Sequence, residues 1–205
     1  MSEPGFRLSP EITEELLLLL RNAHSVLDIG CGNAVLLKAL CTGTNSMTLC
    51  GIDPSFSEHL PEVPQQIQLL PGSAEQIPFP DGSFDAAVMQ CVFSLCQPKE
   101  APREVLRVLK PGGLLILSDL FSDTAEVCIE ENPLLGAVYL RDHLESFFLP
   151  DFKKVYFKDE SRALTDMLIE AIMSDEEDAC GSCIDLATLS RVKARYGIWV
   201  WEKSI

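Results

Sequence analysis

Residues 26–34 read Val-Leu-Asp-Ile-Gly-Cys-Gly-Asn-Ala, and residues 51–54 read Gly-Ile-Asp-Pro. The first stretch is an apolar strand that runs into a Gly30-x-Gly32 turn, and the second is a strand that ends on Asp53. In an open α/β sheet, such turns hold the nucleoside part of a cofactor at the carboxyl ends of the strands. A dinucleotide-binding fingerprint would need a further glycine at position 35, which is Val here. A nicotinamide-dependent oxidoreductase is therefore a disfavoured rival hypothesis.

Length and composition are typical of a single globular domain. The chain has 205 residues, of which 47% are hydrophobic and 23% are charged, so it is long enough to bury a substantial core. Its 31 acidic and 16 basic side chains give a formal net charge of −15. Because a surface of that sign repels phosphate backbones and anionic membranes, we expect no nucleic-acid or membrane partner. A small molecule or a protein side chain is the favoured substrate.

The N-terminal residues and the cysteines bear on the compartment. No basic segment followed by an apolar core stands near Met1, so the sequence predicts no secretory signal. The longest aliphatic run, Leu16 to Leu20, is too short to cross a bilayer. Eight cysteines without a signal peptide indicate free thiols in a reducing cytosol. We therefore expect a cytoplasmic protein.

Strand and helix patterns alternate along the chain, which predicts a parallel sheet built from βαβ units. We expect strands at residues 25–29, 47–52, 66–70, 84–90, 113–119, 155–157 and 198–201, and helices at residues 10–21, about 34–41, 99–109, near 136–148, from Ser161 onward and over 184–195. Pro54, Pro61 and Pro64 leave room only for a short or broken helix after the second strand. Pro111-Gly112-Gly113 should end the helix at 99–109, and the acidic residues 174–178 should form a solvated loop.

Four ordered blocks carry a family resemblance. They are VLDIGCG at 26–32, GIDPS at 51–55, GSAEQIPFPDGSFD at 72–85 and REVLRVLKPGG at 103–113. A lone Gly-x-Gly is a weak signal, but four blocks in this order and at this spacing are a strong one. The sequence resembles the class I, S-adenosylmethionine-dependent methyltransferases that act on small molecules, in the neighbourhood of the ubiquinone-biosynthesis and arsenite methyltransferases.

The resemblance implies a fold and a division of the chain. The expected fold is α/β, with a Rossmann-like, mostly parallel seven-stranded sheet, helices on both faces, an antiparallel last strand and a C-terminal helical elaboration. Residues 1–205 would form one domain. Within it, residues 1–23 would be an N-terminal helix, 24–120 the cofactor-binding core, and 121–205 the part that carries the substrate-side helices and the last strands.

The resemblance also implies that the cofactor is S-adenosyl-L-methionine, which leaves as S-adenosyl-L-homocysteine. The Gly30-Cys31-Gly32 turn would let the backbone approach the methionine moiety. Asp28 would lie beside its ammonium, and Asp53 would accept hydrogen bonds from both ribose hydroxyls. The other cofactor-binding candidates are Pro54, Ser55, Ser73, Ala74, Glu75, Gln90 and Cys91.

The sequence departs from the family pattern at several positions, and other roles stay open. Ser73 stands where members often have an acid that receives the adenine amine, and Ala34 replaces a frequent third glycine. Ser94 and Leu95 stand where histidines are common. Strand-end acids can also be helix caps or loop anchors. A non-catalytic binding module that keeps the fold is therefore the second hypothesis.

The expected chemistry is an in-line displacement at a sulfonium methyl group. Because the leaving group is a neutral thioether, alignment and exclusion of water can supply much of the acceleration, and a general base is optional. The catalytic residues are unknown from the sequence, with Tyr139 and His143 as weak candidates. The acceptor, its attacked atom and any homo-oligomer or partner protein do not follow from the sequence.

Three cysteines suggest a minority alternative. Cys180 and Cys183 form a Cys-x-x-Cys pair, and Cys128 follows the fifth strand on the expected substrate side. Thiol capture of a soft acceptor, as in a metalloid methyltransferase, is one interpretation. Buried free cysteines that act as small hydrophobic residues are the favoured one, and a single Cys-x-x-Cys lacks the second pair typical of structural zinc sites. We therefore expect no bound metal.

Overall fold

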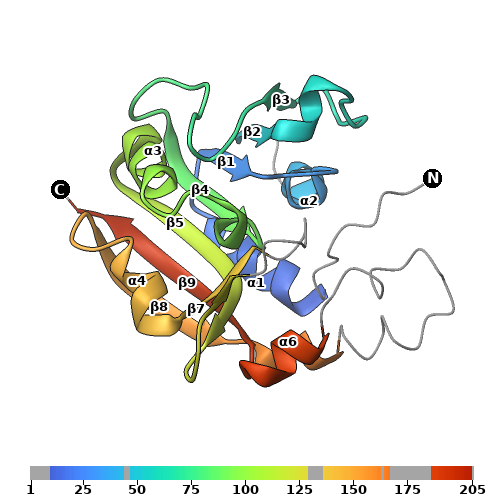
Figure 1. Ribbon diagram of the computed structural model, residues 1–205. Helices are drawn as coiled ribbons and strands as arrows, with labels where there is room; N and C mark the ends of the chain where they lie inside the picture. The colour runs from blue at the N-terminus through green and yellow to red at the C-terminus, as the bar shows by residue number, and fades with distance from the viewer. Residues whose placement is uncertain (1–9, 44–46, 129–135, 163, 167–185, 205) are drawn as a thin grey trace, which may run out of the picture.

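A computed structural model describes residues 10–43, 47–128, 136–162, 164–166 and 186–204. Figure 1 shows one twisted sheet with helices on both of its faces. The described strands are β1 (Ser25–Ile29), β2 (Thr48–Asp53), β3 (Ile67–Pro71), β4 (Phe84–Gln90), β5 (Leu109–Ser122), β6 (Val127–Cys128), β7 (Ala137–Leu140), β8 (Phe152–Asp159) and β9 (Arg195–Lys203). The described helices are α1 (Pro10–Leu20), α2 (Val35–Gly43), η1 (Pro54–Ser57), η2 (Phe93–Leu95), α3 (Glu100–Val108), α4 (Arg141–Ser146) and α6 (Leu186–Arg191).

The main sheet has the strand order β3-β2-β1-β4-β5-β9-β8. The first five of these strands pair in parallel, and β9 is antiparallel to both β5 and β8. The expected mostly parallel sheet with an antiparallel last strand is therefore confirmed. Because the parallel strands run the same way, the carboxyl ends of β1, β2, β4 and β5 meet at one edge. The strand order reverses at β1 and β4, which is where open α/β sheets bind their ligands.

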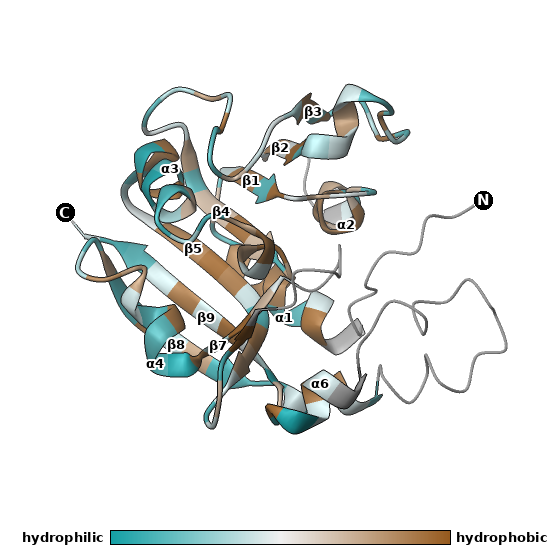
Figure 2. Ribbon diagram, viewed as in Figure 1, coloured by the Kyte–Doolittle hydropathy of each residue, from teal (hydrophilic) through white to brown (hydrophobic). Residues whose placement is uncertain are grey.

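Two apolar clusters fill the spaces between the sheet and the helices. One cluster joins α1, α2 and α6 to strand residues such as Val26 and Val88. The other cluster joins α3 and α4 to Leu27 and Ala87. These two residues are next to Val26 and Val88 in the chain and therefore point to the opposite face of the sheet. Both faces of the central strands are therefore buried, which explains their nearly continuous apolar sequences. Figure 2 shows this hydrophobic character along β4 and β5.

The prediction of a helix near 136–148 is wrong at its start. Residues 137–140 form β7, which pairs with β5 through Phe121–Tyr139 and Ser122–Leu140, and only Arg141–Ser146 are helical. The short strand β6 pairs with β7 in antiparallel fashion. Neither strand was expected, because the apolar residues at 137, 140, 144 and 147 follow a helical spacing. The pairing with the long strand β5 outweighs that local preference.

Three other boundaries differ from the predictions. Helix α3 ends at Val108, and the Pro111-Gly112-Gly113 segment lies inside β5. There β4 and β5 shift register, since Phe84 pairs with Leu109 and Ala86 with Leu114. The residues between them bulge, with Gly112 at φ 73°. The helix expected over 184–195 spans only 186–191 among the described residues, and the acidic loop 174–178 lies outside them.

The proline-rich segment after β2 is short, as expected. It holds only the single 3-10 turn η1, and the chain reaches β3 at Ile67 without a further helix. Within the described residues, no helix is long and apolar enough to span a membrane.

Candidate functional site

The carboxyl ends of β1 and β2 are joined through the Asp53 carboxylate. Its Oδ2 accepts the Gly32 N–H at 3.0 Å. Its Oδ1 accepts the N–H of Ser55 at 2.9 Å and the Ser55 hydroxyl at 2.6 Å, so Asp53 also caps η1. The glycine turn is fastened to β2 a second time, because the N–H groups of Gly30 and Cys31 both donate to the Ile52 carbonyl. The turn at residues 30–32 and the turn at residues 53–55 are therefore joined, and together they form what we call the rim.

Gly30 needs to be a glycine for two separate reasons. Its φ of +68° lies in the left-handed region, which side chains rarely adopt. A Cβ there would also lie 2.4 Å from a methyl group of Val92. Gly32 has φ +46°, but a Cβ at that position would meet no atom within 4 Å. Open space thus lies beside Gly32, on the side where a ligand can approach the backbone.

Asp28 is a buried acid at the floor of this rim. The Asp28 residue is only 3% exposed. Burial, and then the charge of Asp53, raise its pKa to about 8. Among the described residues, none donates a hydrogen bond to its carboxylate. Because an unpaired buried carboxylate is costly, this position is suited to a ligand that brings a cation.

The loop after β3 forms the next part of the rim. Ser73 and Gln76 make an isolated bridge, and Ala74 is buried. The Glu75 carboxylate accepts the N–H of Gln97 at 2.8 Å and so ties this loop to the segment after β4. The expected adenine-side residues therefore lie on one loop that is fixed to its neighbour.

Two side chains that the sequence pattern did not single out hold this loop in place. Arg107 of α3 donates to the carbonyls of Phe79 and Ile77 at 2.7 and 2.9 Å and to Asp81 at 2.9 Å. It also makes a two-pronged pair with Glu104, at 2.7 and 2.8 Å, and Glu104 accepts the Ile77 N–H. Both residues stand in the block at 103–113, so the signal was present in the sequence without a role attached to it.

We expect Arg107→Lys to loosen this loop. A lysine ammonium cannot reproduce the planar fork, so most of these hydrogen bonds would be lost. The predicted cost is about 2 kcal/mol in the free energy of unfolding, measured by urea denaturation. Because Ile77 and Phe79 follow the adenine-side residues directly, affinity for S-adenosylhomocysteine should also fall several-fold. An unchanged midpoint of unfolding would contradict this role.

The end of β4 carries strained backbone and an unpaired amide. The side-chain nitrogen of Gln90 is buried without a hydrogen-bond partner among the described residues. Cys91 has φ 53°, a left-handed conformation that is uncommon for this residue type. Its thiol donates to the Tyr196 hydroxyl at 3.6 Å. Burial and the charge of Asp119 raise the pKa of this thiol, which favours its protonated form.

Asp119, at the end of β5, fixes the turn that follows β4. It is 1% exposed and accepts the N–H groups of Ser94 and Leu120 at 2.9 and 2.8 Å. Burial raises its pKa to about 6, although these hydrogen bonds favour the charged form. Sequence reasoning missed this residue because its partner is 25 positions away.

Strand β7 covers the turn η2. Strand β9 pairs with one edge of β5 along residues 114–121. Strand β4 pairs with the other edge, and β7 pairs with that same edge beyond the point where β4 ends. The contact is close, since a Cβ on Gly136 would lie 2.0 Å from the Ser94 carbonyl oxygen. The segment after β5 therefore lies against the end of β4.

The two weak catalytic candidates stand on this segment. The Tyr139 ring packs against Phe93 and Phe147, with centroids 6.1 and 5.3 Å apart. His143 pairs with Glu126 at 2.6 Å, and its side chain is 48% exposed. The structure thus places Tyr139 near the end of β4 and His143 further toward the surface.

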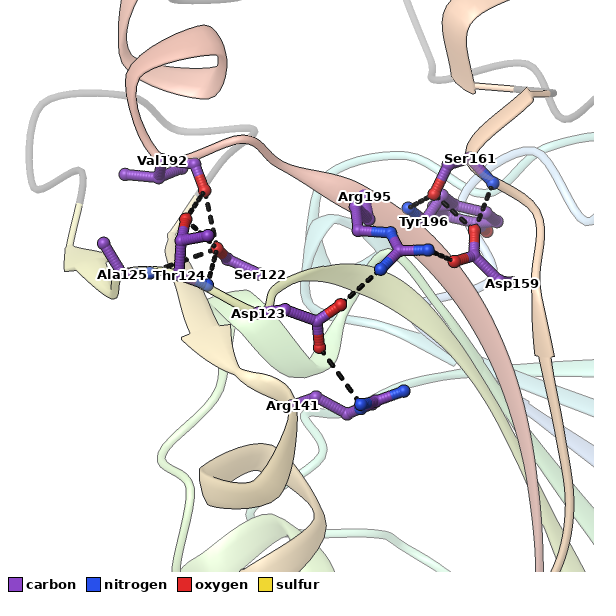
Figure 3. Close-up of polar contacts among 10 residues, drawn as sticks. All are labelled: Ser122, Asp123, Thr124, Ala125, Arg141, Asp159, Ser161, Val192, Arg195 and Tyr196. Carbon is purple, nitrogen blue, oxygen red and sulfur yellow. Dashed lines mark hydrogen bonds and ion pairs between the residues drawn. The ribbon is translucent and has the colours of Figure 1, made fainter.

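A polar network anchors the C-terminal part to the same edge of the sheet (Figure 3). Asp123, just after β5, pairs with Arg141 at 3.3 Å and with Arg195. Arg195 also pairs with Asp159, the last residue of β8. This network therefore connects the ends of β5 and β8 with the starts of α4 and β9.

A second set of hydrogen bonds supports this network. The Ser122 and Thr124 hydroxyls both donate to the Val192 carbonyl, at 2.5 and 3.0 Å. Ser161 donates to Asp159, and its hydroxyl accepts the Tyr196 N–H at 3.2 Å. The connection between β8 and β9 is therefore fastened at both of its ends.

The metal alternative gains no support from the described residues. None of them form a group of three or more His, Cys, Asp or Glu that could hold an ion. Cys180 and Cys183 lie outside the described residues, and only the backbone of Cys128, in β6, is described. Cys31, Cys41, Cys50, Cys91 and Cys96 are free.

Comparison with known proteins agrees with this geometry. Residues 27–117 match the family model described as "Methyltransferase domain". This stretch of the chain is therefore similar to that family. Over 100 residues it is 34% identical to a malonyl-[acyl-carrier protein] O-methyltransferase of Erwinia pyrifoliae, which covers 48% of this chain and 38% of that protein. The chain thus spans less than half the length of this curated relative.

Solved structures share the fold of this chain. A geranyl diphosphate methyltransferase in complex with S-adenosylmethionine superposes with a TM-score of 0.73 at 11% identity, covering 94% of this chain and 84% of that one. The [4+2]-cyclase SpnF superposes with a TM-score of 0.67 at 20% identity, covering 95% and 80%. At such low identity these likenesses establish the Rossmann-like fold alone, which a methyltransferase and a cyclase both use.

Proposed function

We propose that this chain is a methyltransferase that moves the methyl group of S-adenosylmethionine to a small-molecule acceptor. The observation that carries the proposal is the unpaired buried carboxylate of Asp28 below a rim built by Gly30, Gly32 and Asp53. That donor set fits the cofactor. An acid without a partner would face the methionine ammonium, and open space at Gly32 would let its backbone approach the ligand.

The ribose would bind at Asp53. Its carboxylate already accepts three hydrogen bonds, from Gly32 and twice from Ser55. A carboxylate offers about four acceptor sites, so one ribose hydroxyl fits directly. The second would replace the Ser55 hydroxyl, which can rotate away at little cost. Pro54 and Ser55 would therefore adjust the ribose site, and Ser73, Ala74 and Glu75 would flank the adenine.

The acceptor would approach from the end of β4. S-adenosylmethionine supplies an activated methyl group whose leaving group needs no proton. The task of this chain is then to align the acceptor and exclude water. Gln90, Cys91 and the η2 turn, held by Asp119 and covered by β7, form the wall on that side. Tyr139 lies close enough to this wall to orient an acceptor, whereas His143 is occupied by Glu126.

Formation of S-adenosylhomocysteine tests the proposal. The purified protein is incubated with S-adenosylmethionine and a panel of hydroxyl, amine and thiol acceptors, with Asp28→Asn as the matched variant. We expect the wild type to form product with at least one acceptor class and the variant to form far less at the same cofactor concentration. Binding of the cofactor without product from any acceptor would instead favour the non-catalytic module, for which Ser73 and the missing histidines leave room.

We also place the protein in the cytoplasm, without nucleic-acid or membrane partners. The net charge of −15 and the free thiols of the described cysteines support this placement.

A further inference from the structure

Gln90, the last residue of β4, carries a buried amide nitrogen without a hydrogen-bond partner among the described residues. Such a donor costs free energy, because it has given up its hydrogen bonds to water without a replacement. Most buried polar side-chain atoms in proteins do have a partner, so each exception calls for an explanation. A ligand that brings an acceptor atom would supply one.

The strand register places Gln90 close to the unpaired carboxylate of Asp28. Strands β1 and β4 pair in parallel with Asp28 opposite Val88, and Gln90 stands two residues further along β4. Because side chains alternate between the faces of a sheet, all three of these side chains lie on one face. The spacings within a sheet put the Cα atoms of Asp28 and Gln90 about 8 Å apart. An acid that lacks a donor and an amide that lacks an acceptor are therefore neighbours on this face.

The Gln90 side chain lies at the edge of the sheet, where a ligand can meet it. Gln90 is partly exposed, whereas Val88 on the same face is fully buried. The chain turns directly after it, since Cys91 has φ 53° and donates its N–H to the Ser118 carbonyl at 2.7 Å. The last side-chain torsion of glutamine is broad and roughly two-fold. The amide can therefore turn its N–H groups toward the edge while the strand stays in place.

The backbone of the glycine turn does not offer a donor for an anionic group. The N–H groups of residues 30–32 all donate within the protein, two to the Ile52 carbonyl and one to the Asp53 carboxylate. The ionised carboxylates of Asp28 and Asp53 can only accept hydrogen bonds and repel an anion. A ligand carboxylate beside Asp28 therefore needs a side-chain donor, and the Gln90 amide is in place to be that donor.

We infer that Gln90 recognises the carboxylate of the methionine part of the cofactor. The inference rests on the proposed function for the identity of the cofactor. Asp28 would face the ammonium and Gln90 the carboxylate of the same zwitterion, so each unpaired group would gain the partner that it lacks. A hydrogen bond from the amide to a charged oxygen is stronger than one between neutral groups. Because glutamine is uncharged, it would not compete with the ligand ammonium for Asp28.

Calorimetric titration with S-adenosylhomocysteine and with its decarboxylated analogue tests the inference. The analogue keeps the adenosine, the sulfur and the ammonium and lacks only the carboxylate. The wild type should bind S-adenosylhomocysteine about 20-fold more tightly than the analogue. Gln90→Met keeps the length of the side chain without the amide. It should bind S-adenosylhomocysteine about 20-fold more weakly than the wild type does, and the analogue within about twofold of the wild type.

Two controls separate recognition of the carboxylate from a change in the fold. Gln65→Met makes the same chemical change at an exposed residue that precedes β3, at the opposite edge of the sheet, and should bind both ligands as the wild type does. In urea denaturation, Gln90→Met should unfold at the same midpoint as the wild type or above it, because an apolar group replaces an unpaired buried donor. A midpoint well below that of the wild type would show that the amide has a partner within the protein, and would overturn the inference.

Failure of the cofactor proposal gives a different result from failure of this inference. Folded wild-type protein that binds neither ligand would contradict the cofactor site itself, and the role of Gln90 with it. If the wild type binds S-adenosylhomocysteine, the role of Gln90 alone is overturned by either of two results. One is a Gln90→Met variant that keeps the wild-type preference for S-adenosylhomocysteine, and the other is an equal loss of affinity for both ligands in that variant.

Discussion

The Asp28→Asn variant is expected to be more stable than the wild type without ligand and to bind S-adenosylhomocysteine far more weakly. In the folded protein, burial raises the pKa of Asp28 to about 8, whereas an unfolded aspartate titrates near 4. Near neutral pH the wild type must therefore take up a proton to fold. Asparagine removes that requirement, and the expected gain is about 2–4 kcal/mol in the free energy of unfolding at pH 7. The same substitution removes the carboxylate that would face the ligand ammonium, so affinity should fall about 100-fold.

The sign of the pH dependence follows from the raised pKa. Between about pH 4 and pH 8 the folded state binds more protons than the unfolded state, so Asp28 lowers the stability progressively across that window as pH rises. Ligand binding shows the opposite trend, because the ammonium requires the ionised form. Affinity for S-adenosylhomocysteine should rise about 50-fold from pH 6 to pH 8 in the wild type and stay flat in Asp28→Asn. Calorimetric titration and urea denaturation at several pH values measure both effects. A destabilised Asp28→Asn protein with unchanged affinity would contradict this account of Asp28.

Replacement of Gly30 by alanine is the second large effect. The new Cβ would lie 2.4 Å from a Val92 methyl group, at a residue with φ +68°. Overpacking and left-handed strain together should cost about 3 kcal/mol in the free energy of unfolding. Because Gly30 and Cys31 are fastened to the Ile52 carbonyl, the strain would move the rim, and affinity for S-adenosylhomocysteine should fall about 30-fold or more. Urea denaturation and calorimetric titration give the two values.

Two companion variants separate the steric cause from the conformational one. At Gly32 φ is +46°, and an added Cβ would meet no atom within 4 Å. Gly32→Ala should therefore lower the free energy of unfolding by only about 1 kcal/mol. Its affinity should still fall, because the methyl group would occupy the space through which a ligand approaches. Adding Val92→Ala to Gly30→Ala should recover part of the lost stability by removing the clash. If Gly30→Ala were no more destabilising than Gly32→Ala, the close contact with Val92 would not matter.

The parts of the site that are local in sequence could be predicted from it. The Gly30-x-Gly32 turn and Asp53 belong to strands that must end at the same edge of a parallel sheet, so their proximity follows from the pattern alone. The structure adds that Asp53 itself accepts the Gly32 N–H. The structure also adds that Asp28 is buried, inside a five-residue strand that is buried throughout.

The residues that depend on distant partners could not be predicted. Arg107 holds carbonyls 28 and 30 positions away, and Asp119 holds an N–H 25 positions away. Nothing in the local sequence specifies such pairs. The helical spacing of residues 137–147 similarly hides β7, which exists because β5 extends beyond β4 and offers an unpaired edge. Long-range pairing overrides local propensity there.

The most direct test of the central claim is calorimetric titration of ligand-free, reduced protein with S-adenosylmethionine and S-adenosylhomocysteine, with Asp53→Ala and Ser55→Ala alongside. We predict binding of both ligands by the wild type, a loss of about 100-fold in Asp53→Ala, and an affinity within about fivefold of the wild type in Ser55→Ala, which keeps the carboxylate. Folded wild-type protein that binds neither ligand, or an Asp53→Ala variant that binds both as well as the wild type does, would contradict the account.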